Sequence, residues 1–198
     1  MPPPSPAIYL ARHGSSDLAR TDLVYHLPPG PPLTSIGVLE AVELASFLHQ
    51  GGVRRIWTSP LDRACRTAEI AASACSAALI VDDRLTEMQP DETHDDVRAR
   101  AWPVWKEAVA SAIVHGPQAF VAHGGVVTAL LLAIGVGSAT LEEYGRRFDS
   151  GNPLPPGGAW EVTGPDARGA VTPRLVFVPS ADRDVPVSLG IDSTTRSA

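Results

Sequence analysis

The sequence predicts a single α/β domain with a mainly parallel central sheet and helices on both faces. Its 198 residues are enough for one domain with a sizeable core. Short apolar runs alternate with helical patterns along most of the chain, which is typical of strand–helix–strand units. The runs contain few polar residues, as in parallel strands that are covered on both faces. In such sheets ligands bind beyond the carboxyl ends of the strands, so the residues that follow each strand are candidates for a site.

Six apolar runs are predicted to form the strands. They lie at residues 8–11, 56–58, 79–81, 119–122, 160–162 and 175–178. Four helical patterns lie between them, at residues 38–49, from Ser59 to about residue 73, at 94–114, and from about 125 to 134. The first of these helices places its apolar residues on one stripe, opposite two glutamates.

Two positions suggest local helix geometry. Ser59 and Pro60 predict the start of the second helix, because serine caps helix N-termini and proline is favoured at the first helical position. Pro103 predicts an interruption or a kink in the third helix, because proline lacks the N–H that a helix interior uses.

The remaining segments are irregular. Two proline-rich stretches, residues 26–33 and 151–158, are predicted to be loops. The chain beyond residue 180 is polar and lacks periodicity. We therefore predict one folded domain over residues 1–180 and a loosely ordered tail over residues 181–198.

Charge and composition exclude several classes of function. The formal net charge of -6 gives no reason to expect nucleic acid or an anionic membrane as a partner. The N-terminus has neither the basic region nor the long apolar region of a signal peptide. Residues 120–141 lack Asp, Glu, Lys and Arg, but glycines interrupt this stretch, so a buried strand followed by a buried helix is predicted rather than a membrane span.

The two cysteines, Cys65 and Cys75, fall in one predicted helix. Ten residues of helix separate them by roughly 15 Å, which is too far for a disulfide. Free thiols indicate a reducing setting, and we predict a cytoplasmic protein.

Five residues that can carry chemistry stand at predicted strand ends or helix starts. Arg12 and His13 follow the first strand, Arg63 lies in the first turn of the second helix, Glu87 follows the third strand, and His123 follows the fourth. Guanidinium groups suit phosphate oxygens, and a neutral imidazole is a competent nucleophile towards phosphorus. A nearby carboxylate can protonate a leaving oxygen and then activate water.

Each of these residues also has an ordinary reading. Arg12 and His13 can be a polar strand end that faces water, and Arg63 can be a solvated helix residue. Glu87 stands among several other acids, and alone it is best read as a solvated loop residue. Single short motifs have a high false-positive rate. The occurrence of all five residues in order at strand ends favours a phosphate site over these separate readings.

Five segments resemble the histidine phosphatase superfamily, also called the phosphoglycerate-mutase-like proteins. They are "ARHG", "PLTSIGVLEA", "TSPLDRACRTAEI", "DRLTE" and "AHGGVVTALL", and together they span about residues 7 to 135. The resemblance implies the phosphoglycerate-mutase-like fold, with residues 1–180 as its catalytic domain.

The same resemblance implies the roles of the site residues. His13 is identified as the phosphorylated nucleophile, Glu87 as the proton donor and His123 as the second histidine. Arg12 and Arg63 are identified as phosphate ligands.

The chain also departs from the family. "SSDLAR" replaces the usual residues after Arg-His-Gly, so Ser16 is predicted to donate to a phosphate oxygen, and the Gly124 backbone at a helix start adds anion affinity. The stretch after Glu87, "MQPDETHDD", lacks the family's Gly-x-x-Glu-Gly, which leaves Asp91 or Glu92 as alternative acids. The short interval from Glu87 to His123 predicts a small cap region over the site.

From these features we predict a metal-independent phosphatase that needs no cofactor and hydrolyses a small-molecule phosphomonoester through a phosphohistidine intermediate on His13. The departures keep two alternatives open: a non-catalytic module that binds a phospho-ligand, and a phosphoglycerate-mutase-type phosphotransferase. The entrance loops at 26–33, 88–96 and 151–158 contain few positive residues. This favours a singly charged or partly apolar phosphoester over an extended polyanion. The sequence does not indicate an oligomeric state.

Overall fold

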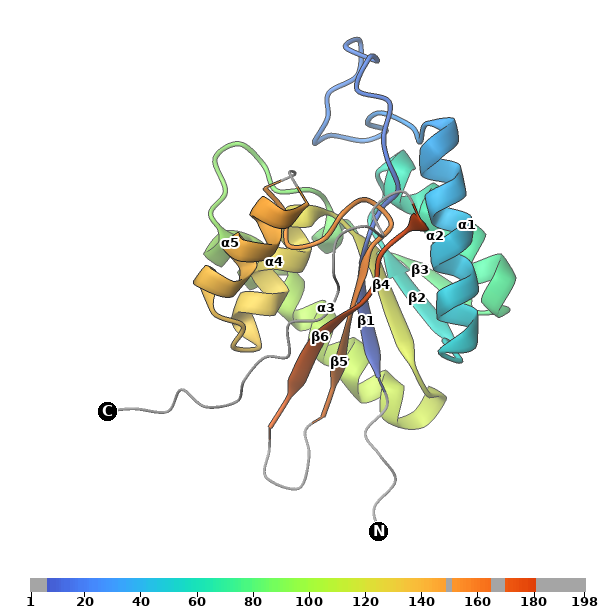
Figure 1. Cartoon of the computed structure of the whole chain (residues 1–198), viewed down its shortest axis with the longest axis vertical. Helices are drawn as coiled ribbons and strands as arrows, with labels where there is room; N and C mark the ends of the chain where they lie inside the picture. Colours follow the sequence, from blue (N-terminus) through green and yellow to red (C-terminus); the bar gives the residue numbers. More distant parts are fainter. Residues whose placement is uncertain (1–6, 149–150, 165–169, 181–198) are drawn as a thin grey trace.

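The computed structural model describes residues 7–148, 151–164 and 170–180. Its centre is a six-stranded sheet with the strand order β3-β2-β4-β1-β5-β6 (Figure 1). The strands are β1 (Ile8–Arg12), β2 (Arg55–Thr58), β3 (Ala78–Val81), β4 (Gln118–Ala122), β5 (Ala159–Thr163) and β6 (Thr172–Phe177). Strands β1 to β4 pair in parallel, whereas β5 runs antiparallel to both of its neighbours. The predicted mainly parallel sheet is confirmed. The predicted tail, residues 181–198, lies outside the described residues.

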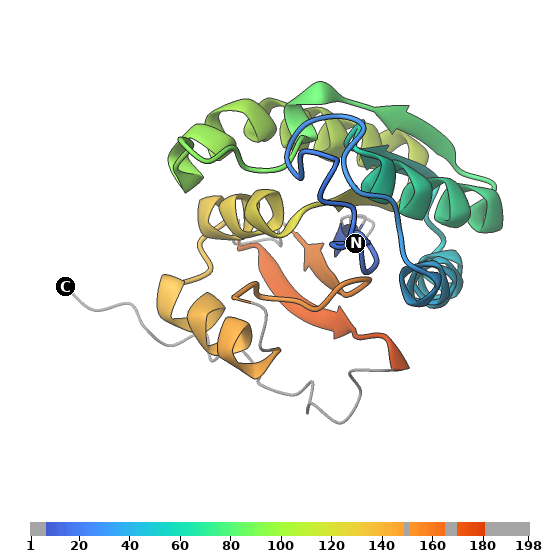
Figure 2. The same cartoon turned by 90° about the horizontal axis from the view of Figure 1, so that it is seen from above.

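Helices cover both faces of this sheet, as predicted (Figure 1, Figure 2). One face carries α1 (Ser35–Gln50) and α2 (Asp62–Cys75), and the other carries α3 (His94–His115), α4 (Gly124–Ala133) and α5 (Ser138–Arg147). A short 3-10 helix, η1 (Asp83–Leu85), follows β3. Alternate side chains of a strand enter opposite layers. In β4, for example, Phe120 packs against α3 and α4, and Val121 packs against α1 and α2.

The start of α2 differs from the prediction. Ser59 does not cap the helix, which begins three residues later, at Asp62, without a side-chain cap. Instead, the Ser59 hydroxyl accepts a hydrogen bond from the N–H of Leu61, in the turn before the helix. The carbonyl of Pro29 accepts the N–H of Asp62 at 2.8 Å, so the proline-rich loop supplies the bond that a capping side chain would otherwise make. Because Pro29 is far from Asp62 in the sequence, no pattern near the start of α2 could predict this capping contact.

Two further differences concern helices. First, α3 continues through Pro103, so the predicted interruption is absent, while a kink there stays a prediction; buried residues on both sides, among them Ala101 and Val104, hold the helix against the sheet. Second, α5 was not predicted. Only a few of its side chains are buried, and the main anchor is Tyr144, whose ring meets that of Trp160 edge-on at 5.0 Å. Such a sparse apolar pattern predicts no helix on its own.

Two expectations from composition are met. Cys65 and Cys75 both lie in α2 as free thiols. Among the described helices, none has both the length and the apolar character needed to cross a membrane. The uncharged stretch at 120–141 instead contributes to β4, α4 and the beginning of α5.

The loop after β1 passes very close to the start of α1. A Cβ atom on Gly37 would lie within 2.1 Å of the carbonyl oxygen of Ser15, and one on Gly14 would lie within 2.3 Å of the Gly37 carbonyl. Thr34 strengthens this crossing, because its hydroxyl caps Gly37 and its N–H donates to the Ser15 carbonyl at 2.9 Å. Glycine at 14 and 37 therefore lets α1 hold the segment that follows β1 in place.

We expect Gly37→Ala to lower the free energy of unfolding by about 1–3 kcal/mol, because the added methyl group would overlap backbone atoms. In an unobstructed helix the same change would stabilise the protein by about 1 kcal/mol. Urea denaturation measures the difference. Gly137→Ala is the matched control, since a Cβ there meets nothing closer than 4.0 Å. Equal stability of Gly37→Ala and the parent chain would contradict the proposed close packing.

Candidate active site

The end of β1 directs Arg12 and His13 towards the carboxyl edge of the sheet. The backbone of this pair is held on both sides: the Arg12 N–H donates to the carbonyl of Gly158, and the His13 N–H donates to the carbonyl of Ala122. The Gly157 N–H donates in turn to the His13 carbonyl at 3.0 Å. The strand end is therefore embedded between β4 and the loop before β5 instead of facing water.

The hydrogen bonds of the His13 ring define its tautomer. Its Nδ1 lies 2.7 Å from the carbonyl oxygen of Gly14, which can only accept a hydrogen bond. Its Nε2 lies 3.1 Å from Nε of Arg63, which can only donate one. The proton of the neutral ring must therefore be on Nδ1, and Nε2 presents its lone pair to the site.

Arg63 is a buried cation in the first turn of α2, with 0% of its surface exposed. Besides its contact with His13, its Nη1 donates to the carbonyl of Tyr25 at 2.9 Å, and the guanidinium lies 4.0 Å from the centre of the Tyr25 ring. Its Nη2 has no hydrogen-bond partner among the described residues. A buried guanidinium with an unused donor is suited to an anionic ligand.

His123 and Glu87 complete the cluster. His123 is the residue before α4, and its ring lies 5.1 Å from that of His13. Neither nitrogen of the His123 ring has a hydrogen-bond partner in the described part of the chain. Its Nδ1 lies 3.6 Å from Oε2 of Glu87, and the same oxygen lies 3.8 Å from Nη2 of Arg63. Donors and acceptors therefore converge around a small space that protein groups leave unfilled.

Electrostatics keep both imidazoles neutral near pH 7. Burial lowers the pKa of His13 well below its usual value, and the charges of Arg63 and Arg12 lower it further. Burial also lowers the pKa of His123 well below its usual value, and His13 and the charges of Arg63, Arg12 and Arg100 lower it further.

Glu87 is shifted in the opposite direction. Burial raises its pKa, although the Met88 N–H and the charges of Arg63 and Arg12 oppose this effect. Glu87 therefore keeps its proton to a higher pH than an exposed glutamate does. A neutral imidazole, whose Nε2 lone pair accepts the Nε–H of Arg63, thus lies near a carboxyl group whose pKa is raised.

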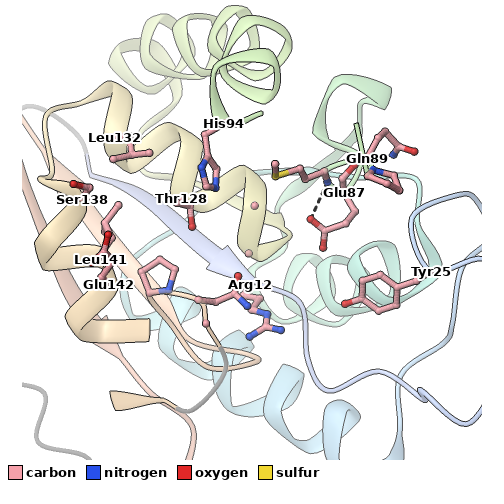
Figure 3. Close-up of a pocket in the computed structure, with 17 residues that line it drawn as sticks. Arg12, Tyr25, Glu87, Gln89, His94, Thr128, Leu132, Ser138, Leu141 and Glu142 are labelled. Atoms are coloured by element: carbon pink, nitrogen blue, oxygen red, sulfur yellow. Dashed lines mark hydrogen bonds between the residues drawn. The ribbon is translucent and has the colours of Figure 1, made fainter. Parts of the chain in front are cut away.

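A cavity of about 690 Å³ adjoins this cluster, and Figure 3 shows the side chains that line it, among them Arg12 and Glu87. Of the predicted site residues, Arg12, Glu87 and Gly124 line it, while His13, Arg63 and His123 are buried next to them. Ser16 is not among the lining residues and instead forms an isolated bridge with Leu33. The role assigned to each of these residues remains a prediction.

The predicted entrance loops contribute unequally to the cavity. The lining includes Met88 to Pro90, His94 and residues 151–153, as expected for two of the three loops. From the first loop region, the cavity-lining residue is Tyr25, one position before the predicted stretch. Within the stretch, Leu27 to Pro29 are exposed, whereas Gly30 is buried, and a Cβ on it would lie within 2.9 Å of Arg63.

Sequence reasoning missed two residues that organise the site. Tyr25 stands in a polar loop without a motif. Arg100 lies inside α3, yet its guanidinium donates to the carbonyls of Arg84, Thr86 and Glu87 and pairs with Glu92 at 2.7 Å. Arg100 thereby holds the loop that carries Glu87. Its contact with Glu92 also engages one of the two alternative acids, and this contact lowers the pKa of Glu92.

The charges around the cluster suit an anion better than a metal ion. Ligand atoms of His13, Glu87 and His123 lie within 4.8 Å of one another, close enough to hold a metal. However, Arg63 already donates to the His13 nitrogen that would face the ion, and a second guanidinium, from Arg12, lies nearby. Two fixed positive charges oppose a divalent cation and favour an anion. The absence of a metal remains a prediction.

Comparison with known proteins supports the resemblance found in the sequence. The family model for the histidine phosphatase superfamily (branch 1) matches residues 8–91. A probable phosphoglycerate mutase GpmB from Proteus mirabilis is 37% identical over 81 residues, which cover 41% of this chain and 37% of the relative. The Escherichia coli protein of the same name is 30% identical over 112 residues, covering 55% and 52%. The chain thus spans about a third to a half of the length of these curated relatives.

Solved structures share the fold over a larger part of the chain. A mycobacterial glucosyl-3-phosphoglycerate phosphatase matches with a TM-score of 0.70 and 23% identity, covering 88% of this chain and 100% of that protein. Bacillus stearothermophilus YhfR matches with a TM-score of 0.69 and 20% identity, covering 89% and 98%. A putative alpha-ribazole-5'-P phosphatase from Escherichia coli matches with a TM-score of 0.63 and 19% identity, covering 87% and 96%. At these identities the matches establish the fold alone, and the predicted phosphoglycerate-mutase-like fold is confirmed.

We expect the free energy of unfolding to fall as the pH is lowered from about 7 to about 5. Because the pKa values of His13 and His123 are lowered in the folded state, the unfolded chain binds protons in this range that the folded chain excludes. Each histidine contributes up to about 1.4 kcal/mol per pH unit. Glu87 acts in the opposite sense, since its raised pKa removes stability as the pH rises above its usual range.

Urea titrations at several pH values measure this slope. His123→Asn is expected to flatten it, and His115→Asn, at the exposed end of α3, is expected to leave it unchanged. An unchanged slope in His123→Asn would contradict the assignment of a buried neutral imidazole.

Proposed function

We propose that this chain, whose residues 8–91 match the family model of the histidine phosphatase superfamily, is a metal-independent phosphatase that hydrolyses a small-molecule phosphomonoester through a phosphohistidine on His13. The observation that carries this proposal is the pair of contacts on the His13 ring. The Gly14 carbonyl holds the proton on Nδ1, and the guanidinium of Arg63 marks Nε2 as an unprotonated nitrogen beside a fixed positive charge. An unprotonated nitrogen is what attack on phosphorus requires.

In the first step, Nε2 of His13 bonds to phosphorus and the bond from phosphorus to the leaving oxygen breaks. Glu87 gives its proton to that oxygen, so an alcohol departs and the carboxylate remains. The raised pKa of Glu87 supports this role, because the group must carry a proton before the step. The Nδ1 proton stays on the ring and is stabilised by the Gly14 carbonyl.

In the second step, water attacks phosphorus and the bond from phosphorus to Nε2 breaks. Glu87 takes a proton from the water and returns to its protonated form. Inorganic phosphate leaves, and His13 is neutral again. Neither step requires a metal ion or another cofactor.

The remaining residues bind the phosphoryl group. Arg12 and the unused Nη2 of Arg63 neutralise its oxygens, and the one N–H of the neutral His123 ring, whose nitrogens have no hydrogen-bond partner among the described residues, donates to another. Gly124 places the start of α4 at the cavity wall, where N–H groups face an anion. These groups stabilise charge on the transferring phosphoryl group.

The free thiols of Cys65 and Cys75 support the proposed cytoplasmic setting of the protein.

The intermediate can be tested directly. We expect acid-labile phosphate on the protein after a rapid quench with 4-nitrophenyl phosphate, and sustained turnover in the presence of EDTA. His13→Ala should lose both the label and the turnover, because it removes the nitrogen that bonds to phosphorus in the proposed first step. His49→Ala, at the exposed end of α1, is the control and should keep both.

Other outcomes identify the alternatives. Binding of inorganic phosphate without turnover would favour a non-catalytic module. Transfer of phosphate to a second position of 3-phosphoglycerate, in place of release, would favour a mutase. Turnover retained in His13→Ala would overturn the proposal.

The role of Glu87 is tested through the leaving group. For ethyl phosphate, whose alkoxide needs a proton, we expect Glu87→Gln to lower the single-turnover rate of His13 phosphorylation by about 10²–10⁴-fold. For 4-nitrophenyl phosphate the loss in this first-step rate should be much smaller, because nitrophenolate departs as a stable anion. With the wild-type chain and ethyl phosphate, activity should fall as the pH rises through the raised pKa of Glu87.

Asp91→Asn provides the matched control and should leave both rates unchanged. Full activity in Glu87→Gln together with loss in Asp91→Asn or Glu92→Gln would move the acid role to that residue. An equal loss for both substrates would contradict proton donation by Glu87.

A further inference from the structure

We propose that this site selects phosphomonoesters of an uncharged or cationic alcohol larger than a three-carbon unit, and that Glu142 determines this preference by repelling a second anionic group. This inference rests on the proposed phosphatase function and deepens it. It follows from the distribution of charge, apolar surface and hydrogen-bonding groups along the cavity.

The cavity has two chemically different ends (Figure 3). Arg12, Tyr25 and Glu87 surround the end where the phosphoryl group would bind. Figure 3 shows Ser138 and Glu142 on the opposite side, contributed by α5. A phosphoester held at the first end therefore directs its alcohol towards α5.

Charge along the cavity opposes a second anion. Among the described residues that line it, Arg12 is the only arginine or lysine, and it is already committed to the phosphoryl group. At the far end the charged lining residue is Glu142. A carboxylate or second phosphate on the alcohol would thus meet a negative charge. Arg146, one turn after Glu142 on α5, shares an adjoining depression with Glu142 but does not line the cavity. An ammonium or hydroxyl group meets no such repulsion.

The walls of the cavity match a mixed alcohol. One set of lining side chains is apolar: Met88, Pro90, Leu132, Leu141 and Pro153. A second set offers hydrogen bonds: Gln89, His94, Thr128 and Ser138. Such alternation suits a ligand with apolar faces and a few hydroxyl or amino groups.

The volume excludes a small alcohol as the natural fit. At about 690 Å³ the cavity lies within the range of roughly 300–1,000 Å³ that accommodates drug-sized ligands. A three-carbon acid would leave the apolar wall formed by Leu132 and Leu141 uncovered. Burial of that wall by a larger alcohol contributes binding free energy that a short one cannot supply.

Three probes that share a phosphate and differ in the charge of a short body test the charge preference: 2-aminoethyl phosphate, glycerol 3-phosphate and 3-phosphoglycerate. We expect kcat/KM to be lowest for 3-phosphoglycerate, by roughly tenfold relative to glycerol 3-phosphate. 2-Aminoethyl phosphate should be hydrolysed at least as well as glycerol 3-phosphate. Equal or better hydrolysis of 3-phosphoglycerate would overturn the inference.

The role of Glu142 is tested by charge reversal with a matched control. Glu142→Lys should raise the ratio of kcat/KM for 3-phosphoglycerate to that for glycerol 3-phosphate by about tenfold or more. Glu143→Lys changes the net charge equally on the same exposed helix, at a residue that does not line the cavity. It should leave the ratio unchanged. The same shift in both variants, or none in either, would contradict a local effect of Glu142.

Alkyl phosphates test the apolar wall. kcat/KM should rise from ethyl to hexyl phosphate, and Leu132→Ser should reduce that rise. No dependence on chain length would overturn the size preference. Failure of this inference differs from failure of the proposed function: 4-nitrophenyl phosphate would still yield phosphate and a labelled His13 in the first case, and neither product in the second.

Discussion

The interaction on which the site depends is the contact between two buried side chains, Arg63 and His13. A guanidinium without exposed surface is costly unless its donors are used, and this one donates to an imidazole and to the Tyr25 carbonyl, beneath an aromatic ring. The contact has a chemical consequence. Because the guanidinium only donates, it requires an unprotonated Nε2, and the Gly14 carbonyl on the other side of the ring retains the proton at Nδ1. The same contacts therefore compensate the buried charge of Arg63 and keep Nε2 of His13 unprotonated.

Several backbone contacts of the fold serve this arrangement. The Ala122 carbonyl and the Gly157 N–H hold the strand end that carries His13, and Gly14 passes against α1 where a side chain would not fit. The Thr67 hydroxyl accepts the Gly14 N–H one turn after Arg63 in the same helix. Helix α2 carries Arg63 and also binds the Gly14 backbone next to His13. The distance between Arg63 and His13 is therefore determined by a helix and a strand end and not by a flexible loop.

The acid side of the site is organised separately. Glu87 stands on a loop without regular structure, and Arg100 holds that loop from α3 by binding three of its carbonyls. Burial raises the pKa of Glu87 and lowers that of His13, so the same buried environment favours the neutral form of both groups. Apart from Arg12, the described residues that line the cavity include no arginine or lysine, and the far end of the cavity is formed by α5. Phosphate capture and recognition of the alcohol are therefore assigned to different parts of the chain.

The sequence by itself determined the alternation of strands and helices, the mainly parallel sheet and the identity of five clustered residues. Strands covered on both faces can be recognised in the sequence as apolar runs. Parallel strands bring their carboxyl ends to one edge of the sheet, so the residues that follow them are predicted to cluster. Only the tertiary structure decided how those residues meet. The Pro29 carbonyl that replaces the predicted Ser59 cap, the stacking of Tyr25 on Arg63 and the support of the Glu87 loop by Arg100 join residues far apart in sequence. The sparse apolar pattern of α5 likewise concealed Glu142. Local patterns encode which face of an element is buried, whereas the partner of a buried polar group depends on the packing of the whole chain.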